Sequence, residues 1–306
     1  MQYPFFSIII SSYNQADYIE QCIQSCINQT YKKFEIIVID NFSDDGTDLI
    51  LDKFKNEIIC KKIHNNDIIS KSKNLGITLS KGNWLAFLDT DDYYTLDKLE
   101  IACNEIKNKN FDVFCNSEYI LRDNSRPKKK EIWTYGNKNS ENFFYKDLIK
   151  YGNCISQSGS IVRKNFITKK NIIWKEDYLI RNVADYDFFL NIASENGKFY
   201  FFVKPLGYHR LRLDSTTNKN IDTLFLALNN VVKDNYKRKK IDKKILNFSM
   251  INLNILELLT INNKSLSKKI FNFFIISLNN PICVFLSLYR IFVKKIKKII
   301  YDLVLK

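Results

Sequence analysis

Three aspartates within four positions are the part of this sequence best suited to chemistry. The stretch WLAFLDTDDYYT, residues 84–95, runs from an apolar segment directly into Asp89, Asp91 and Asp92. Two carboxylates about 5 Å apart repel by roughly 3 kcal/mol at an effective dielectric constant near 20, and by less than about 1 kcal/mol when water surrounds them. This turn is therefore either well solvated or the binding site of a cation.

The elements that position these aspartates alternate along the first half of the chain. Short apolar segments alternate with stretches of helical periodicity, which is typical of an α/β fold with a mainly parallel sheet flanked by helices. The expected strands are Phe6–Ser11, Glu35–Asp40, Ile58–Ile63, Trp84–Asp89 and Asp112–Ser117. The expected helices are Asp17–Asn28, Thr47–Lys55, Ile68–Ser80 and Thr95–Asn108.

Polar clusters follow three of these strands, with SSYN at residues 11–14, DNFSDDGT at 40–47 and DTDD at 89–92. Ligands of such sheets bind at the carboxyl ends of the strands, so the three clusters predict one site at that edge. A single acidic turn is more often a solvated loop or a helix cap, and Thr95 with Asp97 could cap the next helix. Three such turns from one sheet are harder to explain without a ligand.

The glycine patterns that hold phosphates in many nucleotide-binding proteins do not follow the first strand. Neither G-x-G-x-x-G nor G-x-x-x-x-G-K-[ST] is found there. Mg²⁺ or Mn²⁺ is commonly held by one or two carboxylates together with phosphate oxygens of the substrate. The segment DTDD is therefore a candidate clamp for a metal-bound diphosphate.

Taken in order along the chain, these motifs resemble family 2 inverting glycosyltransferases of the GT-A fold, of the type that builds bacterial surface polysaccharides. The residues that carry the resemblance are SIIISSYNQADYIEQCIQSCINQTYKKFEIIVIDNFSDDGT at 7–47 and NLGITLSKGNWLAFLDTDD at 74–92. It extends more weakly to about residue 217. The resemblance implies transfer of a hexosyl or N-acetylhexosaminyl group from a nucleotide sugar, with UDP favoured by family habit. The implied acceptor is a hydroxyl of a glycan or of a lipid-linked glycan.

The resemblance also implies a nucleotide site over the first strand ends. Ser11 and Tyr13 match positions that line the base and ribose, Asp40 matches the carboxylate that reads the uracil edge, and Asp89 is expected to contact the ribose or orient its loop. Such roles suit the side chains, since a carboxylate accepts from a ring N–H and an aromatic ring stacks on a base. Considered alone, Ser11 would be a turn residue and Asp40 a strand-end cap.

The same resemblance assigns the metal to Asp91 and Asp92. Asp91 is expected to coordinate Mn²⁺ or Mg²⁺ directly, with Asp92 close behind. Such an ion stabilises the charge that develops on the departing nucleoside diphosphate.

Asp185, in RNVADYDFFLNIAS at residues 181–194, matches the catalytic aspartate of the family. This residue would deprotonate the acceptor hydroxyl on the face opposite the leaving group. The glutamate that usually precedes it is replaced by Ala184, so the match is weaker and Asp187 remains a rival. Alternatively, both aspartates serve only the first turn of a helix, where the helix dipole favours them.

A further match lies in GYHRLRLDSTT at residues 207–217, which resembles a family segment that usually reads Tyr-Arg-x-His. His209, Arg210 and Arg212 are therefore candidates for diphosphate contacts, since arginine pairs with phosphate bidentately. An arginine stands where a histidine is expected, and it cannot titrate. The region before this segment matches the family only weakly. Its aromatic residues Trp133, Tyr135 and Phe143 could contact a sugar ring or could simply pack in the domain, and the motifs assign them no role.

The net charge of +14 is concentrated near the C-terminus. Residues 233–306 contain sixteen Lys and Arg against four Asp and Glu, which leaves residues 1–232 at +2. A domain that reads nucleic acid would carry its basic patch on its body, so no nucleic-acid partner is expected. We expect a domain at 1–220, with a nucleotide part at 1–117 and an acceptor part at 118–220, followed by a helical basic region at 221–306.

The C-terminal region combines twenty uncharged residues at 270–289 with a following run rich in lysine. Asn279, Asn280 and Pro281 make a poor membrane-spanning helix, so residues 265–306 are expected either to contact a membrane surface peripherally or to pack on the domain. The N-terminus lacks the basic region and cleavage site of a signal peptide. The expected location is cytoplasmic, and at the inner face of the cell membrane if residues 265–306 contact it.

Two alternatives come from other classes of protein. FLDTDDYYT offers the Asp-x-Asp of a haloacid-dehalogenase-like phosphatase, but Tyr93 stands where that family has Thr or Val. A non-catalytic module could instead bind RNA or anionic surfaces through the basic region, with strong salt dependence and no consumption of sugar nucleotide. The seven cysteines include no C-x-x-C pair and are odd in number, which argues against a zinc site or a disulfide framework.

Overall fold

The structure is a computed structural model, and it describes residues 3–122, 131–133, 144–212, 221–238 and 240–260 together with Phe285 and Leu288. The chain divides into two compact units. The first comprises Met1–Tyr145 and Asn153–Lys219, and the second comprises Lys146–Gly152 and Asn220–Lys306. Every candidate site residue belongs to the first unit.

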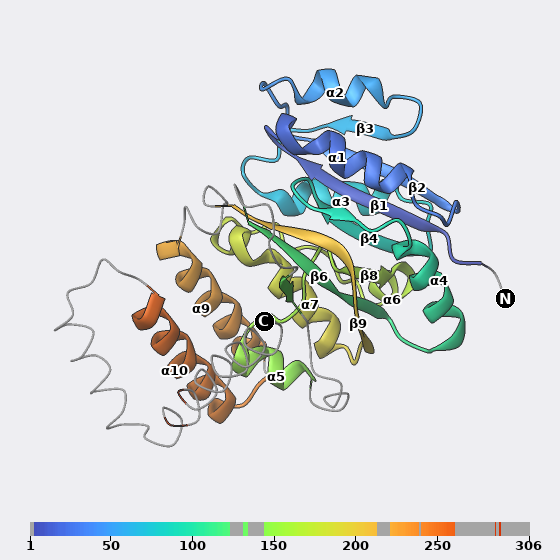
Figure 1. Ribbon diagram of the computed structural model, residues 1–306. Coiled ribbons are helices and arrows are strands. Elements are labelled where there is room, and N and C mark those ends of the chain that lie inside the picture. The colour runs from blue at the N-terminus through green and yellow to red at the C-terminus, as the bar shows by residue number, and fades with distance from the viewer. Residues whose placement is uncertain are drawn as a thin grey trace. The chain divides into compact units, whose positions relative to one another are not determined.

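The helices and strands of the first unit follow one another in Figure 1, with α5 running on into the second unit. In chain order they are β1 (Phe6–Ser12), α1 (Ala16–Ile27), β2 (Phe34–Asp40), α2 (Thr47–Lys53), β3 (Ile59–Lys62), α3 (Ile69–Leu79), β4 (Trp84–Asp89), β5 (Tyr93–Tyr94), α4 (Lys98–Asn108), β6 (Val113–Arg122), β7 (Glu131–Trp133), α5 (Phe144–Tyr151), β8 (Ser160–Arg163), α6 (Lys164–Lys169), the 3₁₀ helix η1 (Tyr178–Val183), α7 (Ala184–Ser194) and β9 (Phe199–Leu211).

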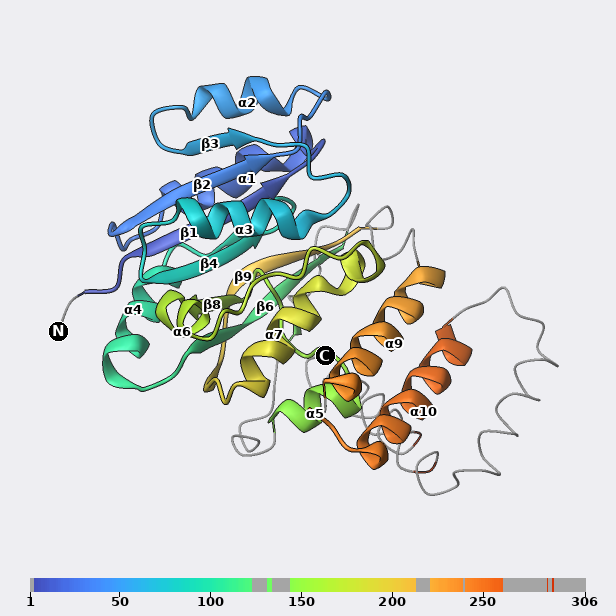
Figure 2. The same ribbon diagram turned by 180° about the vertical axis from the view of Figure 1, so that it is seen from behind.

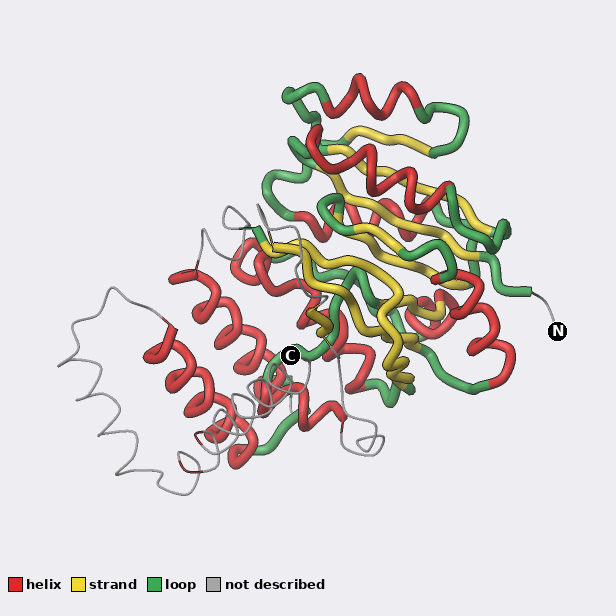
Figure 3. Tube along the Cα trace, viewed as in Figure 1, coloured by secondary structure: helices red, strands yellow, loops and turns green. Residues whose placement is uncertain are grey.

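A mixed sheet forms the centre of this unit, drawn in yellow in Figure 3. Among the described residues its strands follow the order β3-β2-β1-β4-β8-β6-β9-β5, and β7 pairs with β6. Strands β1 to β4 pair in parallel, whereas β8 is antiparallel to both β4 and β6. The five predicted strands are all present and the α/β fold class is confirmed. The antiparallel pairs involve β5, β7 and β8, which are too short to show an alternating pattern in the sequence.

The parallel register brings the three polar clusters together. Ser11 of β1 lies between Ile39 of β2 and Asp89 of β4, and Ser12 lies opposite Asp40. The carboxyl ends of β1, β2 and β4 therefore meet at one edge, as the sequence predicted.

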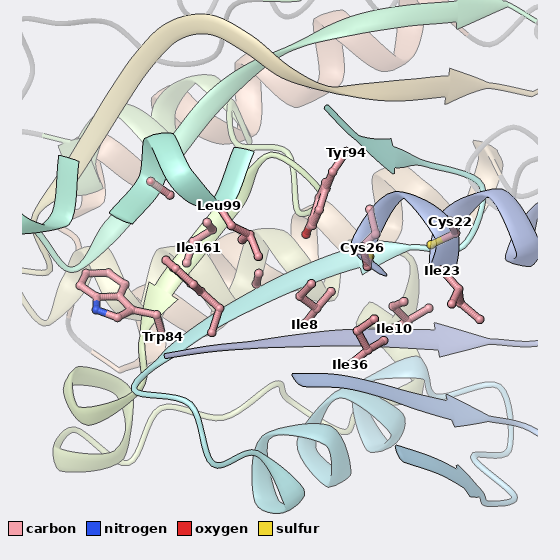
Figure 4. Close-up of a cluster of buried hydrophobic side chains, with 14 of the residues drawn as sticks. Ile8, Ile10, Cys22, Ile23, Cys26, Ile36, Trp84, Tyr94, Leu99 and Ile161 are labelled. Carbon is pink, nitrogen blue, oxygen red and sulfur yellow. The ribbon is translucent and has the colours of Figure 1, made fainter. Parts of the chain in front are cut away.

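Residues of β1 alternate between two buried faces. Ile8 and Ile10 join a cluster that includes Cys22 and Cys26 of α1 and Leu99 of α4 (Figure 4). Cys22 and Cys26 therefore lie on the buried face of α1, together with Ile19 and Ile23. Burial of such side chains contributes about 1.5–3 kcal/mol each, so this cluster is a main stabilising feature of the unit.

The opposite face of the sheet is covered by α3 and α7. Gly76 of α3 packs so closely on Ile9 that an added Cβ would lie 2.4 Å from the Ile9 Cγ2 atom. Phe87, which is next to Ile9 in register, contacts the rings of Trp174 and Phe188 at centroid distances of 5.1 and 5.8 Å. Figure 1 shows α1 in front of the sheet, and Figure 2, seen from behind, shows α3 in front. The sheet is therefore the middle layer of three.

The second unit contains α9 (Ile221–Lys237), α10 (Lys243–Thr260) and the last part of α5. Ser249 Oγ of α10 donates to the carbonyl of Ile149 at 2.9 Å, and Asn252 Nδ2 donates to the carbonyl of Lys150 at 3.1 Å. These side chains satisfy carbonyls of the final turn of α5, which have no partner within their own helix.

Within the described residues, no helix combines the length and apolar character needed to cross a membrane. The segment predicted to touch a membrane, residues 265–306, lies outside the described residues except for Phe285 and Leu288.

The close approach at Gly82 gives a test of the fold. Its N–H donates to Ser7 Oγ at 2.8 Å, and an added Cβ would lie 2.6 Å from the Ser7 nitrogen and 2.7 Å from the Phe5 carbonyl oxygen. Because backbone atoms cannot move aside easily, Gly82→Ala should lower the free energy of unfolding by about 1–3 kcal/mol. Denaturant or thermal unfolding measures the change. Lys81→Ala, which removes a neighbouring exposed side chain, is the control, and equal stability of the two variants would contradict the prediction.

Candidate active site

The acidic turn after β4 is held in place by β9. The backbone N–H of Asp92 donates to the Asp89 carbonyl at 3.0 Å, which closes the turn. The Asp92 carboxylate is buried, and each of its oxygens has a partner: Oδ2 lies 3.0 Å from His209 Nδ1, and Oδ1 accepts the backbone N–H of Arg210 at 2.8 Å. Asp92 therefore fixes the position of β9 against the turn.

Two arginines of β9 and its end flank the same turn. Arg210 Nε donates to the Asp91 carbonyl at 3.1 Å, and Arg212 Nη1 lies 3.7 Å from Asp91 Oδ2. Both guanidinium groups lie near the ring of Tyr18 on α1, at 4.9 and 4.5 Å from its centroid. Arg212 also donates to Gln15 Oε1 at 3.0 Å. The structure thus brings all three basic residues of this segment to the aspartates, more than 110 residues away along the chain.

The pKa shifts of Asp91 and His209 indicate which carboxylate of this cluster lacks a full countercharge. Burial, together with the charges of Asp92 and Asp89, raises the pKa of Asp91 to about 7, and Arg212 opposes the shift only in part. Burial alone would lower the pKa of His209, but the hydrogen bond and charge of Asp92 outweigh it and raise that pKa to about 9. Near neutral pH the histidine is therefore a cation bound to Asp92, and Asp91 lacks a full countercharge.

The turn fits a divalent ion held mainly by one protein carboxylate. Both oxygens of Asp92 accept hydrogen bonds, whereas the partly buried Asp91 carboxylate has one ion pair within the described part of the chain, with Arg212 at 3.7 Å. The described residues contain no group of three or more His, Cys, Asp or Glu side chains arranged to hold a metal ion. Mg²⁺ and Mn²⁺ need no such group, since substrate phosphates and water complete their oxygen ligands.

A buried ion cluster lies beneath the turn. Lys98 of α4 and Glu118 of β6 are 0% and 1% exposed. Lys98 Nζ donates to the Ser158 carbonyl at 2.5 Å and lies 3.9 Å from the Tyr94 ring centroid. Burial lowers the pKa of Lys98 to about 8 despite the charge of Glu118, and burial followed by the charge of Asp92 raises the pKa of Glu118. No motif marked either residue, since each stands alone among residues of ordinary strand or helix pattern.

Asp89 is held from two sides. Gln157 Nε2 donates to its Oδ1 at 2.5 Å, and Lys73 Nζ of α3 lies 3.7 Å from the same oxygen. Lys73 is 3% exposed, its pKa is lowered by burial, and its ammonium lies 4.8 Å from the Trp174 ring centroid. Sequence reasoning missed both partners; a lysine on the buried face of a helix is the one signal that could have indicated Lys73.

Asp185 lies in the first turn of α7, close enough to Asp89 and Lys73 for their charges to affect its pKa. Asn153 Nδ2 donates to its Oδ2 at 2.8 Å. Burial raises the pKa of Asp185 to about 6; the Tyr186 backbone N–H and the charge of Lys73 oppose the shift, and the charge of Asp89 adds to it. The rival Asp187 is 1% exposed, and its Oδ2 accepts a hydrogen bond from Asn191 of its own helix at 2.9 Å.

The residues predicted to bind a base differ in exposure. Tyr13 is 52% exposed, and Ser11 Oγ is buried without a hydrogen-bond partner among the described residues. Asp40 is fully buried, and its carboxylate accepts the backbone N–H and the hydroxyl of Ser43 at 2.9 and 2.6 Å. Asp40 therefore orders the loop that follows β2.

Three aromatic residues were expected either to contact a sugar ring or to pack in the domain, and the structure describes one of them, Trp133. Its indole is 38% exposed, and its ring centroid lies 5.8 Å from that of His209. Tyr135 and Phe143 lie outside the described residues.

A mixed sheet between helical layers, with an acidic turn at the carboxyl ends of its strands, is the arrangement expected of a GT-A glycosyltransferase. The profile of the family described as Glycosyl transferase family 2 matches residues 7–169, more than half of the chain. The chain therefore belongs to glycosyl transferase family 2. This membership does not favour the phosphatase or the non-catalytic binding module.

Individual proteins agree with this assignment. The chain is 35% identical over 118 residues to the UDP-Glc:alpha-D-GlcNAc-diphosphoundecaprenol beta-1,3-glucosyltransferase WfaP of Escherichia coli, which is 38% of this chain and 47% of that protein. The chain spans less than half the length of the first curated relatives it matches.

Solved structures share the fold at low sequence identity. Staphylococcus aureus TarS in complex with UDP superposes with a TM-score of 0.60 and 17% identity, covering 87% of this chain and 77% of that one. The mannosyltransferase PcManGT of Pyrobaculum calidifontis, in complex with GDP-Man and Mn²⁺, gives a TM-score of 0.53 at 13% identity over 85% and 72% of the two chains.

The buried ion cluster gives a second test. Lys98→Met removes one of the two cations, the other being His209, that favour the ionised form of the buried Glu118. It should lower the free energy of unfolding by about 3–5 kcal/mol, because an undercompensated buried charge is costly. Adding Glu118→Gln to Lys98→Met should recover part of the loss in denaturant unfolding. Lys107→Met, which changes an exposed lysine of the same helix, should stay within about 0.5 kcal/mol of the parent. A double variant no more stable than Lys98→Met alone would contradict the charge pairing.

Proposed function

We propose that this glycosyltransferase is a metal-dependent inverting enzyme that uses a UDP-sugar donor. It transfers a hexosyl or N-acetylhexosaminyl group to a hydroxyl of a glycan or lipid-linked glycan. The observation that carries the proposal is the incompletely neutralised Asp91 carboxylate, which has Arg212 beside it, His209 on the neighbouring Asp92, and Asp185 close enough to Asp89 to feel its charge. The UDP bound to TarS and the UDP-Glc named for the E. coli relative support the choice of nucleotide.

On the donor side, Asp91 would hold Mn²⁺ or Mg²⁺ together with diphosphate oxygens of the donor. The bound ion would supply electrostatic stabilisation of the leaving diphosphate. Asp92 takes the supporting role, because both of its oxygens hold β9. His209, Arg210 and Arg212 place positive charge beside the diphosphate. Ser11, Tyr13, Asp40 and Asp89 would bind or order the site of the base and ribose.

On the acceptor side, Asp185 acts as the general base. Its carboxylate accepts the proton of the acceptor hydroxyl as that oxygen bonds to the anomeric carbon, while the bond from the anomeric carbon to the diphosphate oxygen breaks on the opposite face. The configuration is inverted by this single displacement. A pKa of about 6 keeps the carboxylate mostly ionised at neutral pH and still basic enough to take the proton.

The proposed acceptor also bears on where in the cell the reaction takes place. The E. coli relative is named for an acceptor linked to diphosphoundecaprenol, which is a membrane lipid. A lipid-linked acceptor would place this chain at the inner face of the cytoplasmic membrane, and the lysines of residues 265–306 would be attracted to anionic lipids there.

The first test of the proposal is a donor screen. Purified protein with Mn²⁺ and UDP-, GDP- or dTDP-sugars should release a nucleoside diphosphate from one donor class, and release should stop with a chelator. Asp91→Ala should weaken Mn²⁺-dependent donor binding by about 100-fold or more, since it removes the main protein ligand. Asp52→Asn, an exposed carboxylate on α2, is the control. Undiminished turnover by the wild-type enzyme in excess chelator would contradict the role of the metal.

The second test concerns the base. Asp185→Asn should bind the donor normally but lose transfer by about 10²–10⁴-fold. The wild-type rate should rise with pH through about 6, because the raised pKa leaves Asp185 protonated and unable to accept a proton below that value. Asp187→Asn should retain both transfer and this pH dependence. An active Asp185→Asn enzyme would remove the assignment of the base.

A further inference from the structure

Two amide side chains on one short loop each bind a carboxylate of the site. The loop joins α5 to β8, and its amides are four residues apart. Asn153 Nδ2 donates to Asp185 Oδ2 at 2.8 Å, and Gln157 Nε2 donates to Asp89 Oδ1 at 2.5 Å. One carboxylate belongs to the donor side and the other to the acceptor side. The loop therefore links the two halves of the site covalently over a short distance.

The orientation of the Asn153 amide is fixed by its second bond. Its Oδ1 accepts the backbone N–H of Ile155 at 3.0 Å. An N–H group must meet an oxygen acceptor, so the remaining end of the amide, which faces Asp185, is its nitrogen. The hydrogen bond to Asp185 is therefore built into the turn at the start of the loop.

Gln157 is fixed by burial and by its backbone. The residue is 8% exposed, and its carbonyl accepts both the N–H and the hydroxyl of Ser160, at 3.0 and 2.8 Å. The next residue, Ser158, accepts the Asp89 backbone N–H on its Oγ at 3.1 Å. Asp89 is thus held by consecutive residues of the loop through both its side chain and its backbone.

The loop is also anchored to the layers beneath it. The Ser158 carbonyl accepts Lys98 Nζ at 2.5 Å, and the Gly159 carbonyl accepts the Asn116 backbone N–H of β6 at 2.8 Å. An added Cβ on Gly159 would lie 3.0 Å from the Asn116 carbonyl oxygen. These contacts give the loop a defined position relative to β4 and β6. Its two amides can therefore hold Asp185 and Asp89 at a fixed distance from each other.

Charged groups of two other elements face Asp185. Lys73 of α3 favours its ionised form, and Asp89 of β4 disfavours it. The Asn153 N–H favours the carboxylate too, because a donor bonded to a charged acceptor stabilises the charged form. Replacing the Asn153 N–H group by a hydrogen-bond acceptor should therefore change the pKa of Asp185. It should not change the residues proposed to bind the nucleotide sugar.

We propose that Asn153 and Gln157 are positioning residues, Asn153 for the base Asp185 and Gln157 for the donor-side carboxylate Asp89. The loop of residues 153–159 then sets the separation between the base and the bound donor. This inference rests on the proposed function. It predicts that the two amides control different kinetic parameters although they lie on one loop.

The test compares Asn153→Asp with Gln157→Glu, which keep the size of each side chain and, at Asn153, the acceptor for Ile155. Asn153→Asp should move the acidic limb of the kcat/KM profile upward by at least about one pH unit and leave the UDP-sugar KM within about twofold of the parent. Gln157→Glu should raise the donor KM, and the Kd for UDP with Mn²⁺, by about tenfold without moving that limb. Asn108→Asp, at an exposed asparagine of α4, is the control.

The outcomes separate the two levels of the proposal. A wild-type enzyme that releases no nucleoside diphosphate from any donor would remove the proposed function itself. If the wild-type enzyme is active, profiles of both variants that match the parent would overturn the positioning roles. Equal changes of all parameters in both variants, with a lower unfolding temperature, would show a merely structural loop and also overturn them. Asn153→Ala and Gln157→Ala, which add no charge, should show the same division between pH profile and donor KM.

Discussion

The crowding of negative charge at the end of β4 is the constraint that shapes the rest of this site. Asp89, Asp91 and Asp92 cannot all be ionised in a partly buried turn unless positive charge or hydrogen-bond donors reach them. The fold supplies these from separate elements: Lys73 from α3, Gln157 from the loop before β8, and His209 from β9. The compensation is uneven. Asp92 is fully bonded and Asp91 is not, which leaves one carboxylate whose charge a cation would balance.

This uneven compensation divides the work among similar side chains. A carboxylate with both oxygens bonded is a fixed structural group, as Asp92 is for β9 and Asp40 is for the loop after β2. Asp91, with an ion pair at 3.7 Å, and Asp185, with a hydrogen bond from Asn153, are less fully bonded, and in the proposed function they take the metal and the proton. Type of residue therefore does not determine the role here, whereas the number and kind of neighbouring donors does.

The proposed donor and acceptor sides of the site are built from different stretches of the chain. The family profile covers residues 7–169, which include Asp40, Asp89, Asp91 and Asp92 but not the basic segment at 209–212, and the folds of TarS and PcManGT are shared over most of the chain. The proposed acceptor side depends on the hydrogen bond between Asn153 of the loop and Asp185 of α7. Asp185 lies in a recognisable motif, whereas Asn153 has no local signature, so this contact is visible only in the tertiary structure.

The sequence by itself determined five of the strands, β1, β2, β3, β4 and β6, their alternation with helices and the polar residues at the ends of β1, β2 and β4, because periodic burial leaves a periodic pattern. It also indicated Asp91, Asp185 and the basic segment at His209, through the order of motifs along the chain. Only the tertiary structure decided which of these groups touch, and it alone revealed Lys98, Glu118, Asn153 and Gln157. Each of these is a single polar residue whose burial and partners come from segments distant in the chain, so no local spacing records it. The sequence analysis also missed β5, β7 and β8, which have only two to four residues, and the 13-residue β9, whose burial does not alternate along the strand.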